Sequence, residues 1–402
     1  MQRIFALTKK KIFQNIYQQF RNSISIICWN CQKRFLTFVR KKTQSMITDI
    51  EVNKPEPIAS EKKTESFKRG TDVQFAIEAL EAGKPILITE FYNNGMILLH
   101  ELQAHLNRKF PNKSFQEQRE YRSEYHKLSN LILIEIVDHK LAVKKSPWIG
   151  WLEKLYPEKS DFLLSFPQVQ GLNSAWQWYR NGISIPVLRN KIHPYYGTYF
   201  PTRFDHLQLF DNWLKRYKGP KKSAIDVGFG SGVLSLQLIK YGFQKVFGTE
   251  TNPNAIVGFA EFMGDTKLSR KIELDLGHLF GKWEKQTELI VFNPPWLPES
   301  HDFDSFDDAL YYNENLFPDF FAGAKQRLLP EGKLVLLFSN LAQITNVTKK
   351  HPIEKELAEG GRFQLEKCFK KSVKVASEKT KRDQHWRSSE VVELWVLTNN
   401  TN

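Results

Sequence analysis

The second half of the chain alternates short apolar runs with longer stretches in which apolar residues recur at helical spacing. The run at 223–230 ends in a glycine turn and precedes an amphipathic stretch; the runs at 245–250 and 333–339 have similar neighbours. Strands that alternate with helices form parallel sheets, because each helix carries the chain back to the start of the next strand. The last two strand-like segments, near 363–369 and 389–397, lack a clear intervening helix. Residues 216–402 are therefore predicted to form an α/β, doubly wound, mostly parallel sheet with an antiparallel edge strand.

The preceding part of the chain has a different pattern. Thr71 and Gln74 have the spacing of a helix capping box, and an apolar-periodic helix is expected over about 95–106. Two strand patterns on either side of 138–140 predict a hairpin. Residues 71–215 are expected to form a smaller α+β domain that recognises the substrate.

Residues 49–70 mix prolines and charges without apolar periodicity, which predicts a linker. Residues 1–48 form a basic extension with ten of the 58 Lys and Arg residues and none of the 44 Asp and Glu residues. The net charge of +14 therefore comes largely from this extension, and the rest of the chain is close to neutral. The basic footprint of a nucleic-acid-binding domain is accordingly weak.

The extension permits three interpretations: a transit peptide, a basic surface-binding tail, or an upstream reading frame before Met46. The expected location is cytoplasmic, or mitochondrial if residues 1–45 are a transit peptide. Its longest uncharged run, Asn22 to Gln32, is eleven residues, against roughly 20 needed to cross a bilayer, so no membrane span is expected.

The chain has three cysteines, Cys28, Cys31 and Cys368, too few for a disulfide framework, which indicates a reducing compartment. Cys28 and Cys31 have zinc-knuckle spacing, but no second pair follows. We therefore expect no metal.

A glycine-rich turn stands between the first predicted strand of the second half and its helix. It contains Asp226, Gly228, Gly230 and Gly232. Ligands bind at such turns, where glycine lets the backbone approach them closely. The dinucleotide fingerprint requires a third glycine where this chain has Val233, which disfavours a nicotinamide cofactor.

Glu250 ends the next predicted strand, 22 residues after Gly228. A carboxylate there is placed to accept hydrogen bonds from both hydroxyls of a ribose. Taken alone, Glu250 would be a solvated acid at a strand end. The glycine turn at the appropriate distance upstream favours ribose binding.

From about residue 196 to 400 the chain resembles the class I S-adenosylmethionine-dependent methyltransferases, in the branch with the methyltransferase small domain. That branch includes protein-glutamine methyltransferases and RNA base-amino methyltransferases. The segments that carry the resemblance are "IDVGFGSG" at 225–232, "GTETNPNAI" at 248–256, "GHLF" at 277–280 and "FNPPW" at 292–296. The resemblance implies a Rossmann-like fold and S-adenosyl-L-methionine as the cofactor.

The resemblance also implies roles for individual residues. The glycine-turn residues Asp226, Gly228, Gly230 and Gly232 would line the methionine and ribose part of the cofactor, Glu250 would bind the ribose hydroxyls, and Asn252 would lie near the adenine. His278 stands where the family usually has an acid that meets the adenine amino group. Asp275 or a backbone carbonyl is the alternative partner for that amino group.

The predicted fourth strand runs directly into Asn293, Pro294, Pro295 and Trp296. If the Asn293 side-chain oxygen and the Pro294 carbonyl each accept an N–H, they fix a weakly nucleophilic planar nitrogen toward an activated methyl group. The prolines restrict the backbone and Trp296 can stack on a planar substrate group. The structural alternative is a proline turn beside a core tryptophan.

A second segment, His193 to Phe210, resembles the stretch that closes over the cofactor in the glutamine-methylating relatives. It would bring Tyr199, Pro201, Arg203 and Asp205 near the site. The alternative is an interdomain connector with buried aromatic residues.

The sequence thus predicts an N-methyltransferase that acts on a planar amino or amide nitrogen of a macromolecule, either a protein glutamine or an RNA base. The alternative is a non-catalytic methyltransferase-like subunit that binds RNA or a protein partner.

Overall fold

A computed structural model describes residues 50–59, 64–111, 115–264, 266–299, 311–373 and 389–400. The predictions for the basic extension 1–48, with Cys28 and Cys31, lie outside these residues. Within the described ranges, no helix combines the length and the apolar character that a membrane crossing requires.

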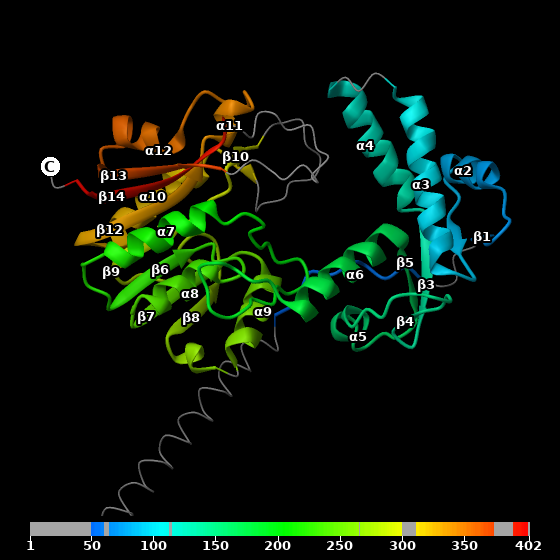
Figure 1. The fold of residues 1–402 in the computed structure, drawn as a ribbon, viewed down its shortest axis with the longest axis horizontal. Helices are drawn as coiled ribbons and strands as arrows, with labels where there is room; N and C mark the ends of the chain where they lie inside the picture. Colours follow the sequence, from blue (N-terminus) through cyan, green and yellow to red (C-terminus); the bar gives the residue numbers. More distant parts are fainter. Residues whose placement is uncertain are drawn as a thin grey trace, which may run out of the picture. The chain divides into compact units, whose positions relative to one another are not determined.

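The first part of the described chain forms a five-stranded sheet with flanking helices (Figure 1). Strands β1 to β3 are parallel in the order β1-β2-β3, and β4 and β5 are antiparallel to β3. The strands are β1 Glu65–Phe67, β2 Ile86–Ile88, β3 Ile132–Val137, β4 Lys140–Leu141 and β5 Phe162–Ser165. The helices are α2 Val73–Glu81, α3 Tyr92–Lys109, α4 Phe115–Ser129, α5 Trp151–Leu155 and α6 Phe166–Asn181.

The hairpin predicted at 138–140 joins β3 to β4. Asp138 and His139 have φ angles of 50° and 55°. Two successive residues in the left-handed region match the right-handed twist of the strands that they join, which explains the tight turn. Val137 pairs with Lys140 across it.

Helix α2 is capped differently from the expectation. The Asp72 side chain accepts the hydrogen bond from Gln74 N. The Thr71 hydroxyl instead accepts from Lys68 N, in the turn before the helix. The capping-box interpretation was therefore wrong by one residue, because Asp and Thr are both strong N-cap residues and the sequence places them side by side.

The predicted linker, 49–70, contains ordered structure. Strand β1 falls inside it and pairs with β2, and Ile58 forms an isolated bridge with Leu163. The structure differs from the expected linker at these positions, since backbone pairing needs no apolar periodicity in the added segment. The boundary between two domains near residue 215 stays a prediction, because the residues from Val52 onward form one compact unit.

The second sheet has seven strands in the order β13-β14-β12-β9-β6-β7-β8. Its strands are β6 Ser223–Val227, β7 Lys245–Glu250, β8 Ile272–Leu276, β9 Thr287–Phe292, β12 Leu328–Ser339, β13 Phe363–Ser372 and β14 Val391–Asn399. Five neighbouring strands, from β12 to β8, are parallel, and β14 is antiparallel to both β12 and β13. The predicted mostly parallel sheet with an antiparallel edge is confirmed.

The helices of this part are α7 Asp205–Arg216, α8 Val233–Lys240, α9 Pro253–Gly264, α10 Leu316–Arg327, α11 Leu341–Ile344 and α12 Pro352–Lys355. A 3₁₀ turn, Lys267–Arg270, and a π-helical turn, Glu356–Gly360, complete them. From β6 the chain passes through α8 to β7, toward the β8 edge of the sheet. From β9 it passes through α10 to β12, toward the opposite edge. Right-handed crossovers therefore place helices on both faces, and the strand order reverses between β6 and β9.

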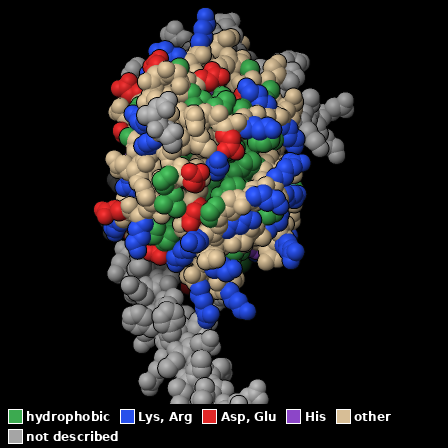
Figure 2. Space-filling view, turned by 90° about the vertical axis from the view of Figure 1, so that its left-hand side faces the viewer, with side chains coloured by type: hydrophobic (Ala, Val, Ile, Leu, Met, Phe, Trp, Pro, Cys, Tyr) green, Lys and Arg blue, Asp and Glu red, His purple; other side chains and the backbone are tan. Residues whose placement is uncertain are grey.

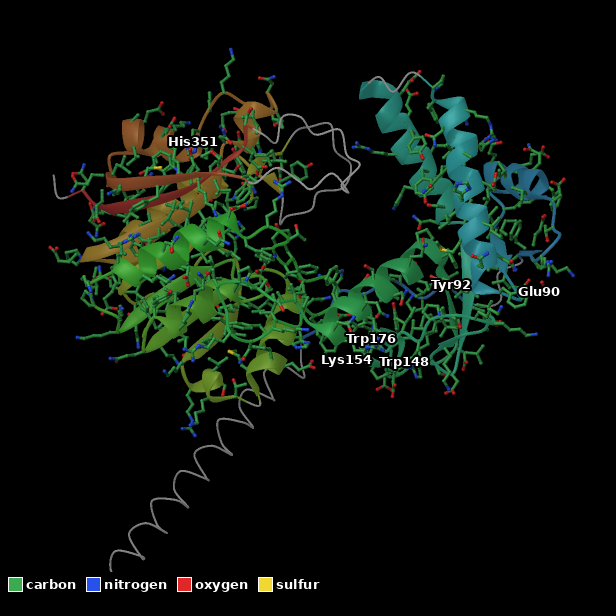
Figure 3. All side chains as sticks on the ribbon, viewed as in Figure 1. Glu90, Tyr92, Trp148, Lys154, Trp176 and His351 are labelled. Atoms are coloured by element: carbon green, nitrogen blue, oxygen red, sulfur yellow. The ribbon has the colours of Figure 1, made fainter. Side chains whose placement is uncertain are left out.

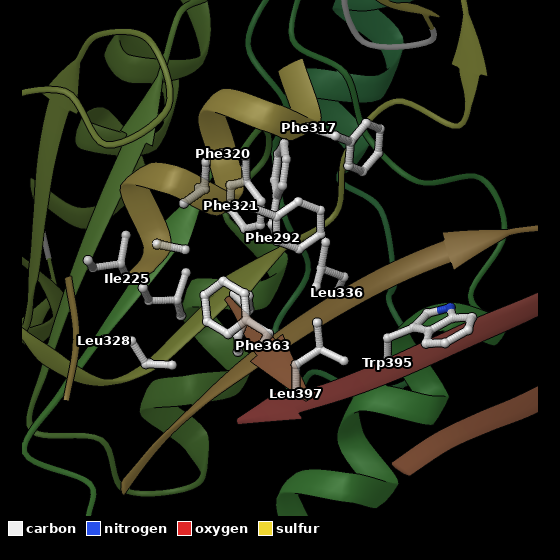
Figure 4. Close-up of a cluster of buried hydrophobic side chains, with 14 of the residues drawn as sticks. Ile225, Phe292, Phe317, Phe320, Phe321, Leu328, Leu336, Phe363, Trp395 and Leu397 are labelled. Carbon is white, nitrogen blue, oxygen red and sulfur yellow. The ribbon is translucent and has the colours of Figure 1, made fainter. Parts of the chain in front are cut away.

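One face of the sheet is packed with aromatic side chains from α10 (Figure 4). Phe317, Phe320 and Phe321 are buried against Phe292 of β9 and Phe363 of β13. The Phe292 and Phe320 rings lie 4.5 Å apart between centroids. Burial of these rings supplies much of the driving force that fixes α10 on the sheet. It also holds the end of β9, from which Asn293 follows.

On the face that Figure 2 shows, Lys and Arg side chains gather along the right-hand and lower part, and Asp and Glu side chains lie mainly toward the left and the centre.

Candidate functional site

A cleft of about 950 Å³ opens at the carboxyl ends of β6, β7 and β9. This is the point at which the strand order reverses, where open α/β sheets bind ligands. Its volume is in the upper range of small-molecule sites. The loops that follow these strands form its floor, and the segment before α7 and the short strands β10 Leu297–Pro298 and β11 Tyr311–Tyr312 contribute further walls.

Gly228 and Gly230 line the cleft, with φ angles of 62° and 52°. Both values lie in the left-handed region that favours glycine. Gly232, with φ of 78°, is not among the lining residues, and a Cβ there would lie 2.3 Å from the Phe259 ring. The structure thus places Gly232 in the packing between the glycine turn and α9, and a role for it in lining the cofactor stays a prediction.

Asp226 also lies beneath the cleft and not in it. It is fully buried, and Ser235 Oγ donates a hydrogen bond of 2.6 Å to its Oδ2. Burial raises the pKa of the Asp226 carboxyl to about 7, although the bond from Ser235 opposes that shift. Its Oδ1 is buried and has no hydrogen-bond partner among the described atoms, and a role of Asp226 toward the cofactor stays a prediction.

Glu250 lines the cleft at the end of β7. Its Oε2 accepts the N–H of Gly230 at 2.8 Å, and its Oε1 accepts the N–H groups of Thr251 and Asn252 at 2.9 and 3.1 Å. One carboxylate therefore joins the glycine turn to the loop after β7. A carboxylate oxygen can accept about two hydrogen bonds, so Oε1 is filled by the two N–H groups, whereas Oε2 accepts one and retains acceptor capacity for a ligand.

Asn252 and His278 both line the cleft. The Asn252 side chain donates to the Gly197 carbonyl at 2.8 Å. Asp275, the alternative partner for an adenine amino group, is not a lining residue; it accepts from Lys282 N at 2.8 Å and pairs with the Lys282 ammonium. Its carboxylate is therefore turned toward the loop and away from the cleft.

All four residues of the loop after β9, Asn293, Pro294, Pro295 and Trp296, line the cleft. Asn293 Oδ1 and Trp296 Nε1 are buried and have no hydrogen-bond partner within the described ranges. A buried acceptor or donor without a partner costs about 1–3 kcal/mol, and such groups often mark a ligand site. These are the four residues that the sequence singled out as catalytic, and that role stays a prediction.

His206 and Thr198 are among the polar residues of the cleft that were not singled out from the sequence. His206 is 5% exposed, and its ring stands at 89° to the Trp296 ring with 5.4 Å between centroids. Burial lowers the pKa of His206 to about 4, so the imidazole is neutral at pH 7. His206 Nδ1 and Thr198 Oγ1 have no partner among the described atoms.

The segment before α7 is divided between two environments. Tyr199 and Pro201 line the cleft. Arg203 pairs instead with the buried Glu390 at 2.6 Å, and Asp205 pairs with Lys371 at 2.7 Å. The last two residues fasten the segment to the region around β13 and β14.

Comparisons with known proteins find similarity to methyltransferases in this part of the chain. Residues 207–367 match the family model of the methyltransferase small domain. A Methanocaldococcus jannaschii protein named for protein N5-glutamine methyltransferase activity is 31% identical over 121 residues, which cover 30% of this chain and 57% of that protein. The ribosomal protein L11 methyltransferase of Lachnospira eligens is 38% identical over 76 residues, covering 19% of this chain and 24% of its own length.

Among solved structures, the ribosomal protein L11 methylase of Lactobacillus delbrueckii subsp. bulgaricus matches with 18% identity and a TM-score of 0.35. The match covers 52% of this chain and 84% of that one. The chain thus spans little more than half of the first curated relative and about a quarter of the second. Over residues 207–367 the chain is similar to the methyltransferase small domain family.

Proposed function

We propose that the protein is an S-adenosylmethionine-dependent N-methyltransferase that acts on a planar amide or amino nitrogen of a macromolecule. The observation that carries the proposal is the buried, unpartnered oxygen of Asn293, which lies in one cleft with Gly228, Gly230 and Glu250. One end of that cleft offers groups suited to a nucleoside, and the other offers an acceptor suited to an N–H donor.

The residues of the cleft fit the cofactor. A Cβ on Gly228 would contact only Phe292, at 3.6 Å, and one on Gly230 only the Tyr199 carbonyl, at 3.5 Å, so the bare backbone leaves room for a ligand. Glu250 would accept hydrogen bonds from the ribose hydroxyls. Asn252 and His278 would lie near the adenine. When bound, the cofactor supplies a methyl group on a sulfonium.

The loop after β9 would orient the nitrogen that receives this methyl group. Asn293 Oδ1 and the Pro294 carbonyl would each accept one N–H, which turns the nitrogen lone pair toward the methyl group. The same acceptors would stabilise the positive charge that develops on the nitrogen. Trp296 would stack on the planar group, with its indole held edge-on by His206. A neutral His206 adds no competing positive charge there.

A protein is the substrate class that we would test first. Both curated relatives carry the names of protein methyltransferases, one for glutamine and one for ribosomal protein L11. The near-neutral charge beyond the first 48 residues also offers little attraction for RNA phosphates.

The test is tritium transfer from methyl-labelled S-adenosylmethionine into an extract of cells that lack the protein. We expect label that protease removes and ribonuclease leaves in place. Label removed by ribonuclease would assign RNA as the substrate. A protein that binds the cofactor and transfers no label to either class would favour the non-catalytic subunit.

A further inference from the structure

A short segment far upstream of the methyltransferase small domain forms part of the cleft wall. We call this segment, Asn53–Pro55, the strap. Asn53 lines the same cleft as Glu250 and Asn252, and it is exposed. Contact with the cleft is not expected of a linker, so we consider the contacts that hold the strap in place.

Asn254 holds the strap from one side. It lies four residues after Glu250, in the first turn of α9, and it is completely buried. Its Oδ1 accepts the Asn53 N–H at 2.7 Å, and its Nδ2 donates to the Asn53 carbonyl at 2.8 Å. Nδ2 also donates to the Tyr196 carbonyl at 2.7 Å. One carboxamide thus pairs with the backbone of Asn53 in both directions and fixes a second wall segment.

The strap is held from the other side by Leu155, the last residue of α5, and by Tyr156, which follows it. Lys54 Nζ donates to the Leu155 carbonyl at 2.8 Å, and the buried Tyr156 hydroxyl donates to the Pro55 carbonyl at 2.7 Å. The neighbouring Lys154, labelled in Figure 3, makes an ion pair of 2.8 Å with Glu261 of α9. These contacts fix the backbone of Asn53. The Asn53 side chain makes none of them, so it is free to bind a ligand in the cleft.

We propose that Asn53 contacts the adenosine part of the cofactor, and that Asn254 is the positioning residue that holds it there. The inference rests on the proposed function. The adenosine end is the end at Glu250, and the Asn53 backbone is bonded to Asn254, four residues after Glu250. The acid expected for the adenine amino group is absent, because His278 takes its place and Asp275 is bonded to the Lys282 backbone. A carboxamide offers one acceptor and two donors, which match the amino group and ring nitrogens on an adenine edge.

The first test uses the full chain, Asn53→Ala, and the matched control Glu56→Ala, an exposed neighbour that does not line the cleft. Calorimetry measures Kd for S-adenosylhomocysteine and for 5′-methylthioadenosine, which lacks the amino-acid end. Asn53→Ala should weaken both ligands by the same factor, roughly 5- to 10-fold, the scale of one hydrogen bond. Glu56→Ala should change neither Kd, and both variants should keep the melting temperature.

The 6-oxo analogue S-inosylhomocysteine tests the adenine edge directly. The unaltered chain should prefer S-adenosylhomocysteine, and Asn53→Ala should lose most of that preference. An unaltered Kd for S-adenosylhomocysteine in Asn53→Ala would overturn the inference and leave the proposed function intact. Failure of the unaltered chain to bind S-adenosylhomocysteine at all would overturn the proposed function, and the inference with it.

Asn254 is tested through Asn53. Asn254→Ala should weaken S-adenosylhomocysteine at least as much as Asn53→Ala does, and the double variant should bind little worse than Asn254→Ala alone, because the two act through one contact. Asn254→Asp keeps the acceptor for Asn53 N and loses both donations, so it serves if the alanine variant does not fold. Fully additive losses would overturn the positioning role.

Discussion

Asn293 is the residue on which the proposed chemistry depends. We expect Asn293→Ala to keep cofactor affinity and to reduce methyl transfer by roughly 10²-fold or more, the scale seen when a preorganised hydrogen-bonding group is removed. Asn293→Asp should retain more activity than the alanine variant, because a carboxylate still accepts the N–H. The measurements are calorimetry and turnover on the substrate that tritium transfer identifies. Full turnover in Asn293→Ala would return the loop to a structural role.

A change at Glu250 tests cofactor binding separately from methyl transfer. Glu250→Ala should weaken S-adenosylmethionine binding by about 1.5–3 kcal/mol, because hydrogen bonds to a charged group are lost. Part of this loss would arise from the three backbone N–H groups that Glu250 accepts. The matched control is Glu273→Ala on the adjacent strand β8, where the acid pairs with Lys245 away from the cleft. Equal affinity in the Glu250 variant and the control would remove the ribose assignment.

Asp226 gives a prediction about how the stability of the fold depends on pH. Burial raises its pKa from 3.8 to about 7, so the folded protein keeps a proton that the unfolded chain has lost between those values. The stability that Asp226 contributes is present below pH 3.8 and is lost as the pH rises to 7. Asp226→Asn has no such loss. Its melting temperature relative to the unaltered chain should rise between about pH 4 and pH 7 and then level off.

His206 acts in the opposite direction over much of the same range, because burial lowers its pKa from 6.5 to about 4. Between these pH values the unfolded chain binds a proton at His206 that the folded chain does not, so the contribution of His206 to the free energy of unfolding grows as the pH rises. The contributions of His206 and Asp226 partly cancel in the unaltered protein. A melting temperature for Asp226→Asn that runs parallel to the unaltered chain from pH 4 to 7 would contradict the buried-carboxyl assignment.

At the scale of elements, the junction between β6 and α8 depends on Gly232. Gly232→Ala should destabilise the fold by about 2 kcal/mol, since alanine at φ of 78° is strained and its Cβ would meet the Phe259 ring. The matched control is Gly171→Ala within α6, where a Cβ meets nothing within 4 Å. That change should raise stability slightly. Thermal unfolding measures both, and a neutral Gly232→Ala would contradict the packing argument.

The sequence predicted the strands and helices whose apolar residues recur at strand or helix spacing. The apolar runs of β6, β7 and β9 and the amphipathic α8 and α9 appear where expected. Helix α10 ends at Arg327, and β12 begins directly afterwards at Leu328, which pairs with Thr287. A segment with Pro330 and Gly332 does not have the pattern of a strand, and only its pairing with β9 extends it.

The residues of the candidate site also divide into those that a local pattern predicts and those that only long-range contacts place there. Residues at strand ends, such as Glu250 and Asn293, were predictable because parallel strands bring their carboxyl ends together. Asn53, Thr198 and His206 reach the cleft through contacts distant in sequence, which no local pattern encodes. Asp226 belongs to the recognisable motif, yet its burial beneath the turn depends on α8, which supplies Ser235.

At the scale of the whole molecule, a chain shortened to begin at Met46 should fold and bind cofactor like the full chain. Residues 1–45 contain no acidic residue to pair with their bases, and the hydrogen bonds of the strap begin at Asn53. A chain shortened to begin at Ser60 removes the strap and should bind cofactor more weakly. Comparison of the two by thermal unfolding and calorimetry checks the prediction, and a Met46 chain without affinity would contradict it.

The position of β14 bears on how the protein emerges from the ribosome. This strand is the last of the sheet to be synthesised, yet it lies between β12 and β13 and pairs with both. Until residues 391–399 leave the exit tunnel, β12 has an unpaired edge and β13 has no neighbour in the sheet. Nascent chains that stop short of β14 should therefore remain dependent on chaperones, and release of this one strand should permit the sheet to close.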